Sequence, residues 1–549
     1  MVHMTGKEAL IEILKVEGVE YVFGLPGATE VFFIDALEGH AEIKYILGLQ
    51  ESLCLGMAEG YARASGKPGV VNLHTSSGLA AATPLLINAY AGKVPLLVTA
   101  GNQDNRLNMQ EPPLGEFDLP GMAAPFTKWS TEVTFINDLP MVMRRAFKVA
   151  LQPPPGPVFV SLPQNLLQES FDFEYIPNGP FFSGKPPDRE ALSRAVDLLS
   201  RARTPVLVVG AGIARDEALS EVILLAELIG SPVYQPHMSD LNFPLRHPQY
   251  LENLDEESIF TRQVLNSMDV LLVIGAPQTQ VPRPLLSKKD AHIIQIDNDP
   301  WEVAKNVPVS VGMESNIQIA LTEVIHALQE KIRAEQKEAA IMRAMDVAKE
   351  KKRKQDAFMV KVQKERDHVP VSASRLILEL KDALKPDSVI VDDSWSCSAT
   401  LRQFMDILDP KGYYRFRGGG SIGWAMPGAI GVQLAFPRRP VVAISGDGSA
   451  MWGNQSLWTA AAYGLPITYV VCANARYQYV IAGKIRRMGK DSGRRLMGLK
   501  FEDPRIAFDK LAEAMGIHGR KVERPQDLKE AFQAAMELEG PSLIEVTIE

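Results

Sequence analysis

The stretch Val441-Val442-Ala443-Ile444-Ser445-Gly446-Asp447-Gly448-Ser449 decides the fold class of this chain. The apolar, β-branched run over residues 441–445 predicts a buried strand of a parallel sheet. Gly446 breaks the run, so we expect Asp447 at the carboxyl end of the strand. Open α/β sheets bind their ligands at that edge. The stretch therefore predicts a doubly wound α/β domain with a ligand site at Asp447.

A second predicted strand brings another polar side chain to the same edge. We expect a helix over residues 455–463 and a strand over residues 467–472, after which Asn474 follows. The carboxylate of Asp447, the amide oxygen of Asn474 and the main-chain carbonyl of Arg476 would together form an all-oxygen site. Such ligands suit Mg²⁺ or Ca²⁺, which can hold a diphosphate.

A second signature lies near the start of the chain. Residues 43–49 are strand-like, and Glu51 then opens the apolar helical run of residues 52–58. A carboxyl group in apolar surroundings is poorly solvated, which suits a group that must exchange a proton. Glu59, further along the same helix, is the competing candidate, with a structural role as its alternative.

Length, charge and cysteine usage bound the class of protein. The 549 residues suggest three or four domains, and the net charge of −8 argues against a general nucleic-acid binder. Cys54, Cys397 and Cys472 stand in apolar surroundings, which predicts no disulfide framework and a reducing, cytoplasmic location. Residues 1–15 are predicted as an amphipathic helix without a signal-peptide core, and no apolar run is long enough to span a bilayer. We expect a cytoplasmic enzyme.

Three α/β blocks are predicted, over residues 1–175, 189–335 and 368–549, with a charged helical linker over residues 336–367. The turn Gly210-Ala211-Gly212 in the second block lacks the third glycine of a dinucleotide fingerprint, so a structural turn is favoured. The predicted strands cover residues 21–24, 43–49, 69–73, 96–99 and 158–162 of the first block, 205–209, 270–274 and 292–296 of the second, and 388–392, 441–445 and 467–472 of the third.

The Gly446-Asp447-Gly448 turn followed by Asn474 resembles the metal–diphosphate motif of thiamine-diphosphate (ThDP) enzymes. The first asparagine of that family's pair is Ala473 here, while the asparagine that binds the metal is present. The resemblance covers nearly the full chain. It implies three doubly wound parallel-sheet domains in the order pyrimidine-binding, middle and diphosphate-binding. That order is the one of the decarboxylase and acetolactate synthase superfamily. Residues 72–75 and 428–434 are most similar to benzoylformate decarboxylases, and residues 58–68 look at least as much like acetolactate synthases.

The resemblance also implies roles for single residues. Glu51 would hydrogen-bond the aminopyrimidine ring of ThDP, the carbonyl of Gly420 would accept from its amino group, and Ile422 would support the bent cofactor. Asp447, Asn474 and Arg476 would bind the metal. Trp395 replaces a threonine, so one phosphate contact of the family is missing. The other cofactor contacts implied by the resemblance are Pro26, Gly27, Ser396, Gly448, Ser449 and Tyr477.

On the substrate side the resemblance is less complete. His74 stands where the first of two substrate-site histidines belongs and could act as a general acid; a histidine that only caps a strand end is the alternative. The family's serine is replaced by Ala28, and the second histidine falls at or near Pro282. With fewer proton donors, the intermediate left after decarboxylation lives longer and can attack a second carbonyl compound. Gln110, in the polar loop of residues 102–115, is a further substrate-side candidate.

The leading hypothesis is a ThDP- and Mg²⁺-dependent enzyme that cleaves a C–C bond next to a carbonyl. Its donor would be a 2-oxo acid, with release of an aldehyde or carboligation. An acetolactate synthase-type transferase, a 2-hydroxyacyl-CoA lyase and a non-catalytic ThDP-binding paralogue stay open as alternatives. The basic segment of residues 484–495 would favour the CoA-linked lyase if it binds an anion; a solvated loop or subunit contact is the other interpretation.

Cofactors and partners follow from the same resemblance. No flavin site is recognisable in the middle block, so FAD is not expected. The resemblance implies a homodimer or homotetramer with active sites between subunits. A small 2-oxo acid or 2-hydroxyacyl substrate is expected, and neither a nucleic acid nor a membrane is expected as a partner.

Overall fold

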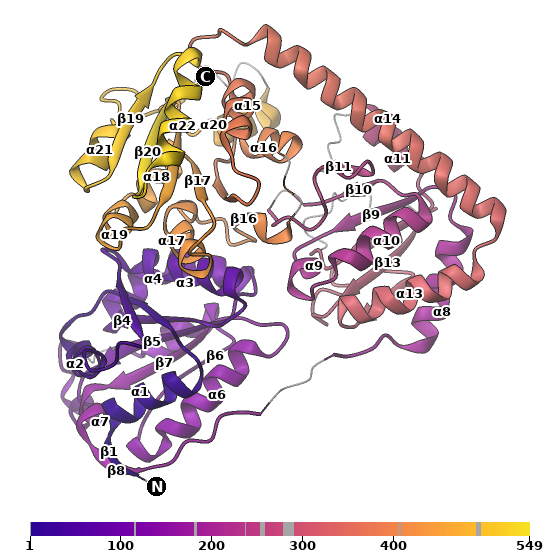
Figure 1. Ribbon diagram of the computed structural model, residues 1–549. Coiled ribbons are helices and arrows are strands. Elements are labelled where there is room, and N and C mark those ends of the chain that lie inside the picture. Colours follow the sequence, from indigo (N-terminus) through magenta and orange to yellow (C-terminus); the bar gives the residue numbers. More distant parts are fainter. Residues whose placement is uncertain are drawn as a thin grey trace.

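The computed structural model describes residues 2–114, 117–179, 184–236, 238–252, 259–277, 290–405, 407, 409–489 and 496–549. Its main architecture is three six-stranded, all-parallel sheets with helices around them, one in each of three lobes (Figure 1). The predicted fold class, three doubly wound α/β domains, is confirmed. A two-stranded antiparallel pair, β1 (Val2–Thr5) with β8 (Ser170–Phe173), is added to the first lobe.

The first sheet has the strand order β3-β2-β4-β5-β7-β6. Its strands are β2 (Tyr21–Gly24), β3 (Lys44–Leu47), β4 (Gly69–His74), β5 (Leu96–Asn102), β6 (Trp129–Glu132) and β7 (Val158–Pro163), and its helices are α1 (Gly6–Val16), α2 (Val31–Leu37), α3 (Glu51–Ser65), α4 (Thr75–Ala91), α5 (Leu119–Ala123), α6 (Leu139–Leu151) and α7 (Gln164–Gln168). The predicted helix over residues 1–15 is wrong at its start. Thr5 and Glu8 form a capping box there, so the helix begins only at Gly6 and strand β1 precedes it.

The second sheet has the order β11-β10-β9-β12-β13-β14, which in chain order is the 3-2-1-4-5-6 arrangement of dinucleotide-binding folds. Strands β9 and β12 have the predicted bounds. The strands are β9 (Pro205–Val209), β10 (Val233–Tyr234), β11 (Tyr250–Glu252), β12 (Val270–Ile274), β13 (His292–Asp297) and β14 (Val311–Glu314), and the helices are α8 (Arg189–Arg201), α9 (Gly212–Arg215), α10 (Leu219–Ile229), α11 (Ile259–Ser267) and α13 (Ile317–Lys331).

The third sheet, β16-β15-β17-β18-β20-β19, repeats the order of the first: in chain order both are 2-1-3-4-6-5. The order in which strands are added therefore reverses between β2 and β4 in one sheet and between β15 and β17 in the other, and we call these places the reversal points. The strands are β15 (Val389–Asp393), β16 (Tyr413–Arg415), β17 (Val441–Gly446), β18 (Ile467–Ala473), β19 (His518–Val522) and β20 (Ser542–Thr547), and the helices are α15 (Ala373–Ala383), α16 (Ser398–Phe404), α17 (Ala425–Ala435), α18 (Asp447–Gly453), α19 (Ser456–Ala462), α20 (Gln478–Met488), α21 (Phe508–Ala514) and α22 (Leu528–Glu537).

The segment between the second and third sheets forms one helix of 31 residues, α14 (Ala334–Lys364). At 1.5 Å per residue it is about 46 Å long. It runs along the outside of the molecule from the middle lobe to the last one (Figure 1). Few of its side chains are buried, Val347, Phe358 and Val362 among them, as the charged sequence of this segment predicts.

The first and third lobes meet through α3 and α17. A Cβ atom on Gly60 would overlap the carbonyl oxygen of Gly428, so only glycine allows these two backbones to approach so closely. The guanidinium of Arg63, one turn further along α3, lies over the ring of Trp424 with its central carbon 4.6 Å from the ring centroid.

One carboxylate joins all three lobes. Asp240, from the middle lobe, pairs with Arg63 of the first lobe through one oxygen and with Arg417 of the third through the other, at 2.5 Å from its Nη2. Glu59 lies 2.9 Å from the same Arg63, and all four side chains are almost completely buried. Burial alone would raise the pKa of Asp240, but Arg417 and Arg63 outweigh it and lower that pKa.

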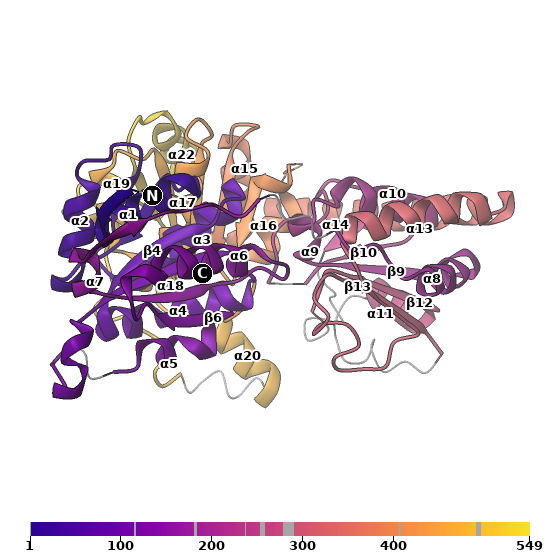
Figure 2. The same ribbon diagram turned by 90° about the horizontal axis from the view of Figure 1, so that it is seen from below.

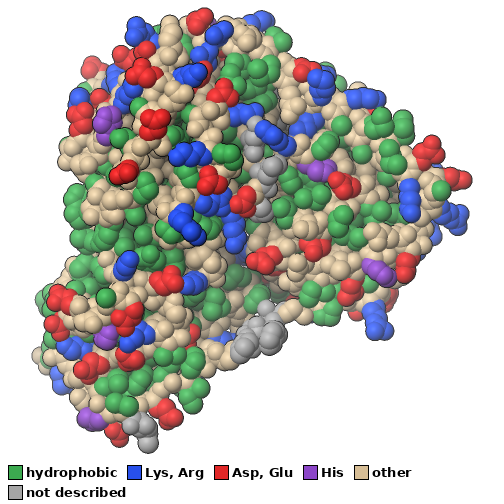
Figure 3. All heavy atoms as spheres, viewed as in Figure 1, with side chains coloured by type: hydrophobic (Ala, Val, Ile, Leu, Met, Phe, Trp, Pro, Cys, Tyr) green, Lys and Arg blue, Asp and Glu red, His purple; other side chains and the backbone are tan. Residues whose placement is uncertain are grey.

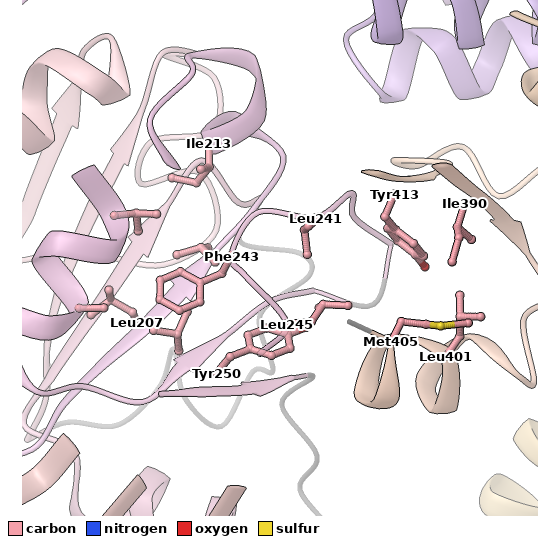
Figure 4. Packing of buried hydrophobic residues seen from close by; sticks show 14 of the residues in the cluster. Leu207, Ile213, Leu241, Phe243, Leu245, Tyr250, Ile390, Leu401, Met405 and Tyr413 are labelled. Carbon is pink, nitrogen blue, oxygen red and sulfur yellow. The ribbon is translucent and has the colours of Figure 1, made fainter. Parts of the chain in front are cut away.

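Apolar packing continues across the same junction. The cluster around Phe243 in the middle lobe extends through Leu241 toward Tyr413 and Met405 of the third lobe (Figure 4). On the face seen in Figure 3, acidic and basic side chains are interspersed over all three lobes. All three cysteines are free and buried. No helix within the described ranges is both long and apolar enough to cross a membrane.

Candidate active site

Asp447 lies directly after β17, at the reversal point of the strand order in the third sheet. Its carboxylate accepts hydrogen bonds from three backbone N–H groups, those of Gly448 (2.8 Å), Asn474 (2.8 Å) and Ala475 (2.5 Å). Burial raises the pKa of this carboxyl, and the three N–H groups partly offset that effect. A carboxylate can accept about four hydrogen bonds or metal contacts. Asp447 therefore retains acceptor capacity for a cation while it fixes two loops together.

The loop after β18 supplies further oxygen atoms. The side-chain oxygen of Asn474 accepts from the backbone N–H of Arg476 at 3.2 Å, which holds the loop in a tight turn. Within the described ranges no three His, Cys, Asp or Glu side chains gather into a metal site. A cation at this edge would accordingly rest on one carboxylate with amide and main-chain oxygens, a donor set that fits Mg²⁺ or Ca²⁺.

A cavity of about 320 Å³ opens beside this edge. It brings together residues from four separate stretches of the third lobe. Nine of its lining residues are site residues expected from the sequence: Ser396, Gly420, Ile422, Asp447, Gly448, Ser449, Asn474, Arg476 and Tyr477.

The carboxylate of Asp393 anchors the loop that carries Gly420 and Ile422. Asp393, at the end of β15, accepts from the backbone N–H groups of Gly423 (2.7 Å) and Trp424 (3.1 Å). Burial raises the pKa of Asp393 to about 7. Gly420 itself has φ of +85°, and a Cβ there would meet no atom within 4 Å, so its backbone faces open space.

Two aromatic residues form one wall of the cavity. Trp395 has a left-handed backbone (φ +47°), and its ring lies 4.8 Å from that of Tyr479 at the start of α20. Phe416 supports the Trp395 ring from 5.0 Å. Tyr479 was not expected in the site from the sequence, because it stands beyond the recognised motif on a helix with only one buried residue, Ile481.

Glu51 and His74 lie together in the first lobe, at the corresponding reversal point of its sheet. Glu51 begins α3 and His74 ends β4, and a Cβ on Gly78 would lie 3.5 Å from both Glu51 Oε1 and His74 Cβ. Gly27 is in direct contact with the His74 ring, since a Cβ there would overlap it. The Glu51 side chain is partly exposed. By contrast Glu59 is fully buried against Arg63, which agrees with the structural alternative for that residue.

Glu30 is a neighbour of His74 and Gly27 that sequence reasoning missed. Its Oε2 lies 3.0 Å from His74 Nδ1 and accepts from the backbone N–H of Gly27 at 2.8 Å. Its Oε1 accepts from Gly101 N–H (2.8 Å) and from the hydroxyl of Thr29 (2.7 Å). His74 ends β4 and makes no side-chain cap for α4. The signal in the sequence was an acidic residue placed just before the apolar run of residues 31–34.

The other substrate-side residues are less tightly placed. Pro26, Ala28 and Gln110 are exposed, and Gln110 ends the short 3₁₀ helix Asn105–Gln110. Pro282 and the last part of the basic segment, residues 490–495, lie outside the described residues. The part of that segment before residue 490 belongs to α20, which carries the exposed side chains of Arg486 and Arg487. Helix α20 projects from the body on the same side as α5 (Figure 2).

The residues around Asp447 in the third lobe and the pair Glu51 and His74 in the first lobe do not share this cavity within one chain. Among the described residues of the first lobe none lines the 320 Å³ cavity, although both groups occupy equivalent reversal points of sheets with the same strand order.

Comparisons with known proteins match this arrangement. Residues 4–122 match the model of the thiamine pyrophosphate enzyme N-terminal TPP binding domain, residues 192–324 its central domain, and residues 395–546 its C-terminal TPP binding domain. The chain is 30% identical to benzoylformate decarboxylase of Pseudomonas aeruginosa over 99% of this chain and 98% of that protein. The chain belongs to the thiamine pyrophosphate enzyme family. Glu51 and His74 fall within the N-terminal match, and Asp447 and Asn474 within the C-terminal one.

Other relatives span two activities of this family. A probable acetolactate synthase large subunit of Methanococcus aeolicus is 28% identical over 100% of this chain and 92% of that protein. Among solved structures, the ThDP-dependent 4-hydroxybenzoylformate decarboxylase of Rhodococcus jostii has a TM-score of 0.84 at 28% identity, covering 100% of this chain and 99% of the other. Benzoylformate decarboxylase of Polynucleobacter necessarius has a TM-score of 0.86 at 25% identity, covering 99% and 98%. The chain is therefore related to benzoylformate decarboxylases and to acetolactate synthases.

Proposed function

We propose that this protein is a ThDP- and Mg²⁺-dependent enzyme that decarboxylates a 2-oxo acid and then releases an aldehyde or joins the acyl unit to a second carbonyl compound. The observation that carries this proposal is the gathering of Asp447, Asn474, Gly420 and Ile422 around one cavity at the reversal point of the third sheet. That lobe matches the family's C-terminal TPP binding domain.

The proposed cation site consists of Asp447, Asn474 and the carbonyl of Arg476, and the diphosphate would be held by that cation together with Ser396 and Ser449. When bound, ThDP supplies a nucleophilic carbon and an electron sink that allows CO₂ to leave a 2-oxo acid. Gly420, whose backbone faces open space, is suited to accept a hydrogen bond from the pyrimidine amino group through its carbonyl.

Glu51 is proposed to exchange a proton with the pyrimidine ring. Since Glu51 does not line the diphosphate cavity of its own chain, we propose that a second copy supplies it and that the active unit is a homodimer or homotetramer. Pro26 and Gly27 would then contact the cofactor from the same side. Helix α20, which projects with one buried residue, is suited to lie against the partner.

His74 is proposed to hold and deliver a proton at the substrate carbon. Glu30 binds its Nδ1, which leaves Nε2 for the substrate. The side chain of Ala28 has no group that can donate a proton. Its exposed position near the end of β4, where His74 stands, fits a site with fewer proton donors than a pure decarboxylase needs. Carboligation is therefore included in the proposal, with Gln110 as a substrate contact.

Product analysis tests the proposal. The purified protein with ThDP and Mg²⁺ receives benzoylformate or pyruvate, each alone and with an aldehyde acceptor. Aldehyde and CO₂ from one oxo acid would establish a decarboxylase, and a 2-hydroxy ketone or acetohydroxy acid would establish a ligase. Failure to turn over either oxo acid, in protein that binds ThDP, would contradict the proposal.

A CoA-linked lyase is the second candidate, supported by the exposed Arg486 and Arg487 on the helix whose first turn lines the cavity. Cleavage of a 2-hydroxyacyl-CoA that is lost on Arg486→Gln together with Arg487→Gln would favour it. We further propose domain limits of 1–175, 189–335 and 368–549, a linker segment over 336–367 that is mostly formed by α14, a cytoplasmic location and no requirement for FAD.

A further inference from the structure

A second cavity of about 320 Å³ lies in the middle lobe, far from the residues assigned above. It is enclosed by the carboxyl ends of α8 and α10 and by the first turns of α14, which lie close together at the outer edge of that lobe (Figure 1). The cavity is beside the amino end of β9, because Arg203 and Thr204 directly precede that strand. Dinucleotides bind at the opposite, carboxyl edge of such sheets. The cavity is therefore not the nucleotide crevice of this fold.

Three arginines converge on this cavity: Arg201 and Arg203 at the rim and Arg343 from α14. One carboxylate, Glu335, lines it as well. In the part of the chain that the structure describes, none of the three guanidinium groups has an ion-pair partner. Three arginines against one carboxylate give the lining an excess of positive charge, although Asp197 and Asp269 outside the lining interact electrostatically with Arg201 and Arg343.

Arg343 is the most constrained of the three. Its Nη2 donates to the carbonyl oxygen of Ile229 at 2.7 Å, whereas its Nε is shielded from solvent and has no hydrogen-bond partner. Burial lowers the pKa of Arg343, with Asp269 opposing that effect only at a distance. A partly buried guanidinium with an unused donor costs free energy unless an acceptor reaches it.

The rest of the wall is apolar. Leu199, Leu228, Ile229 and Ile332 line the cavity together with alanines of α14. A planar guanidinium binds a carboxylate or phosphate through two parallel hydrogen bonds, while apolar side chains favour a hydrophobic body. The volume is at the lower end of the range of small-molecule sites.

From the unpaired arginines and the apolar wall we propose that this cavity binds a small organic anion, with an oxyanion group at Arg343 and Arg203 and an apolar body against Leu228 and Ile332. The proposal goes beyond the ThDP chemistry and does not depend on it. Carboxylate and phosphate share the chemistry that the arginines recognise, and the experiment distinguishes them.

The test is isothermal titration calorimetry on the full-length protein saturated with ThDP and Mg²⁺, so that phosphate groups do not compete for the diphosphate site. The probes are phenyl phosphate, benzoate, inorganic phosphate and the neutral benzyl alcohol. The variants are Arg203→Gln, which removes a guanidinium without a hydrogen bond or ion pair to the described residues, and Arg343→Gln. Lys337→Gln is the matched control, since Lys337 is an exposed cation on the same helix that does not line the cavity.

We expect phenyl phosphate or benzoate to bind the wild type and Lys337→Gln equally, and to lose at least tenfold in affinity with Arg203→Gln and with Arg343→Gln. The tighter of the two aromatic anions identifies the oxyanion. Binding that is unchanged in both arginine variants, or no binding of either aromatic anion to the wild type, overturns the proposal. Inorganic phosphate that binds as tightly as the aromatic anions also overturns the proposal, because the apolar wall would then contribute nothing. Benzyl alcohol that binds as tightly overturns it as well, because the arginines would then contribute nothing.

Discussion

Nδ1 of His74 lies 3.0 Å from Oε2 of Glu30, a carboxylate whose side chain is only 1% exposed. Three further donors, from Gly27, Thr29 and Gly101, fix that carboxylate. These hydrogen bonds hold the Glu30 carboxylate in place, and the carboxylate in turn orients the His74 imidazole.

Replacing Glu30 by Gln should lower kcat by about tenfold and leave KM nearly unchanged, because the neutral amide holds the His74 ring less firmly than the carboxylate that now lies 3.0 Å from its Nδ1. Steady-state rates over a range of substrate concentrations measure the effect. Glu132→Gln is the control, because Glu132 receives bonds from Asn102 and Ser161 of the same sheet but does not touch His74. An unaltered kcat in Glu30→Gln would exclude a role for Glu30 in positioning His74.

Replacing Asp447 by Asn should weaken the joint binding of ThDP and Mg²⁺ by at least 100-fold, because the only carboxylate of the proposed cation site is lost. Quenching of Trp395 fluorescence can report binding, since this ring lines the cavity. Asp527→Asn, which breaks only the surface pair with Arg524, should leave binding unchanged. Equal affinities in the two variants would exclude Asp447 as a cation ligand.

Glu51→Gln and Glu59→Gln should separate chemistry from stability. We expect Glu51→Gln to bind ThDP and keep its melting temperature but to lose turnover by at least 100-fold. Glu59→Gln should lower the melting temperature, because Arg63 loses a buried partner at 2.9 Å. Thermal unfolding and single-turnover rates distinguish them. Normal turnover in Glu51→Gln would contradict its assigned role.

Asp392 and Asp393 should respond to pH in opposite ways. Although burial opposes it, the nearby Arg415 and the Ser394 bonds lower the pKa of Asp392 to about 2, whereas burial raises the pKa of Asp393 to about 7. Stability from Asp392 is present above its unfolded value near 4 and is lost only as pH falls toward 2. Stability from Asp393 is complete below about 4 and is lost as pH rises toward 7.

The melting temperature of cofactor-free protein, measured from pH 5 to 8, checks this difference. Asp393→Asn should flatten the decline with rising pH and gain in relative stability near pH 8. Asp392→Asn should be destabilised at every pH in that range, because it leaves Arg415 buried without its partner at 2.7 Å. If the melting temperature falls with pH equally steeply in Asp393→Asn and in the wild type, ionisation of Asp393 does not destabilise the folded protein.

Much of the fold could be predicted because central strands of parallel sheets are apolar on both faces. Strands β9 and β12 have the predicted bounds for this reason. Edge strands carry no such signal: β6 has the sequence Trp-Ser-Thr-Glu with every side chain partly exposed, and it was missed. Strand β16 has only three residues. Its stability comes from pairing with β15, which no local pattern reveals.

The site was predictable where chemistry demands a residue type at a fixed spacing, as for Asp447 and Asn474. Glu30 was missed because its importance lies in contacts with Gly101 and His74, which are distant in sequence and become neighbours only at the sheet edge. Tyr479 was missed for the same reason, since its contact with Trp395 depends on the direction in which α20 leaves the sheet.

The carboxylate of Asp240 has a consequence for how the molecule comes apart. If the middle lobe opened alone, Arg417 would lose its carboxylate partner at the junction of the other two lobes, and Arg63 would keep only Glu59. Losing one partner of such a buried arrangement costs about 3–5 kcal/mol. Partial melting is therefore penalised, and calorimetry should record one cooperative transition that splits into separate steps when Asp240 is replaced by Ala.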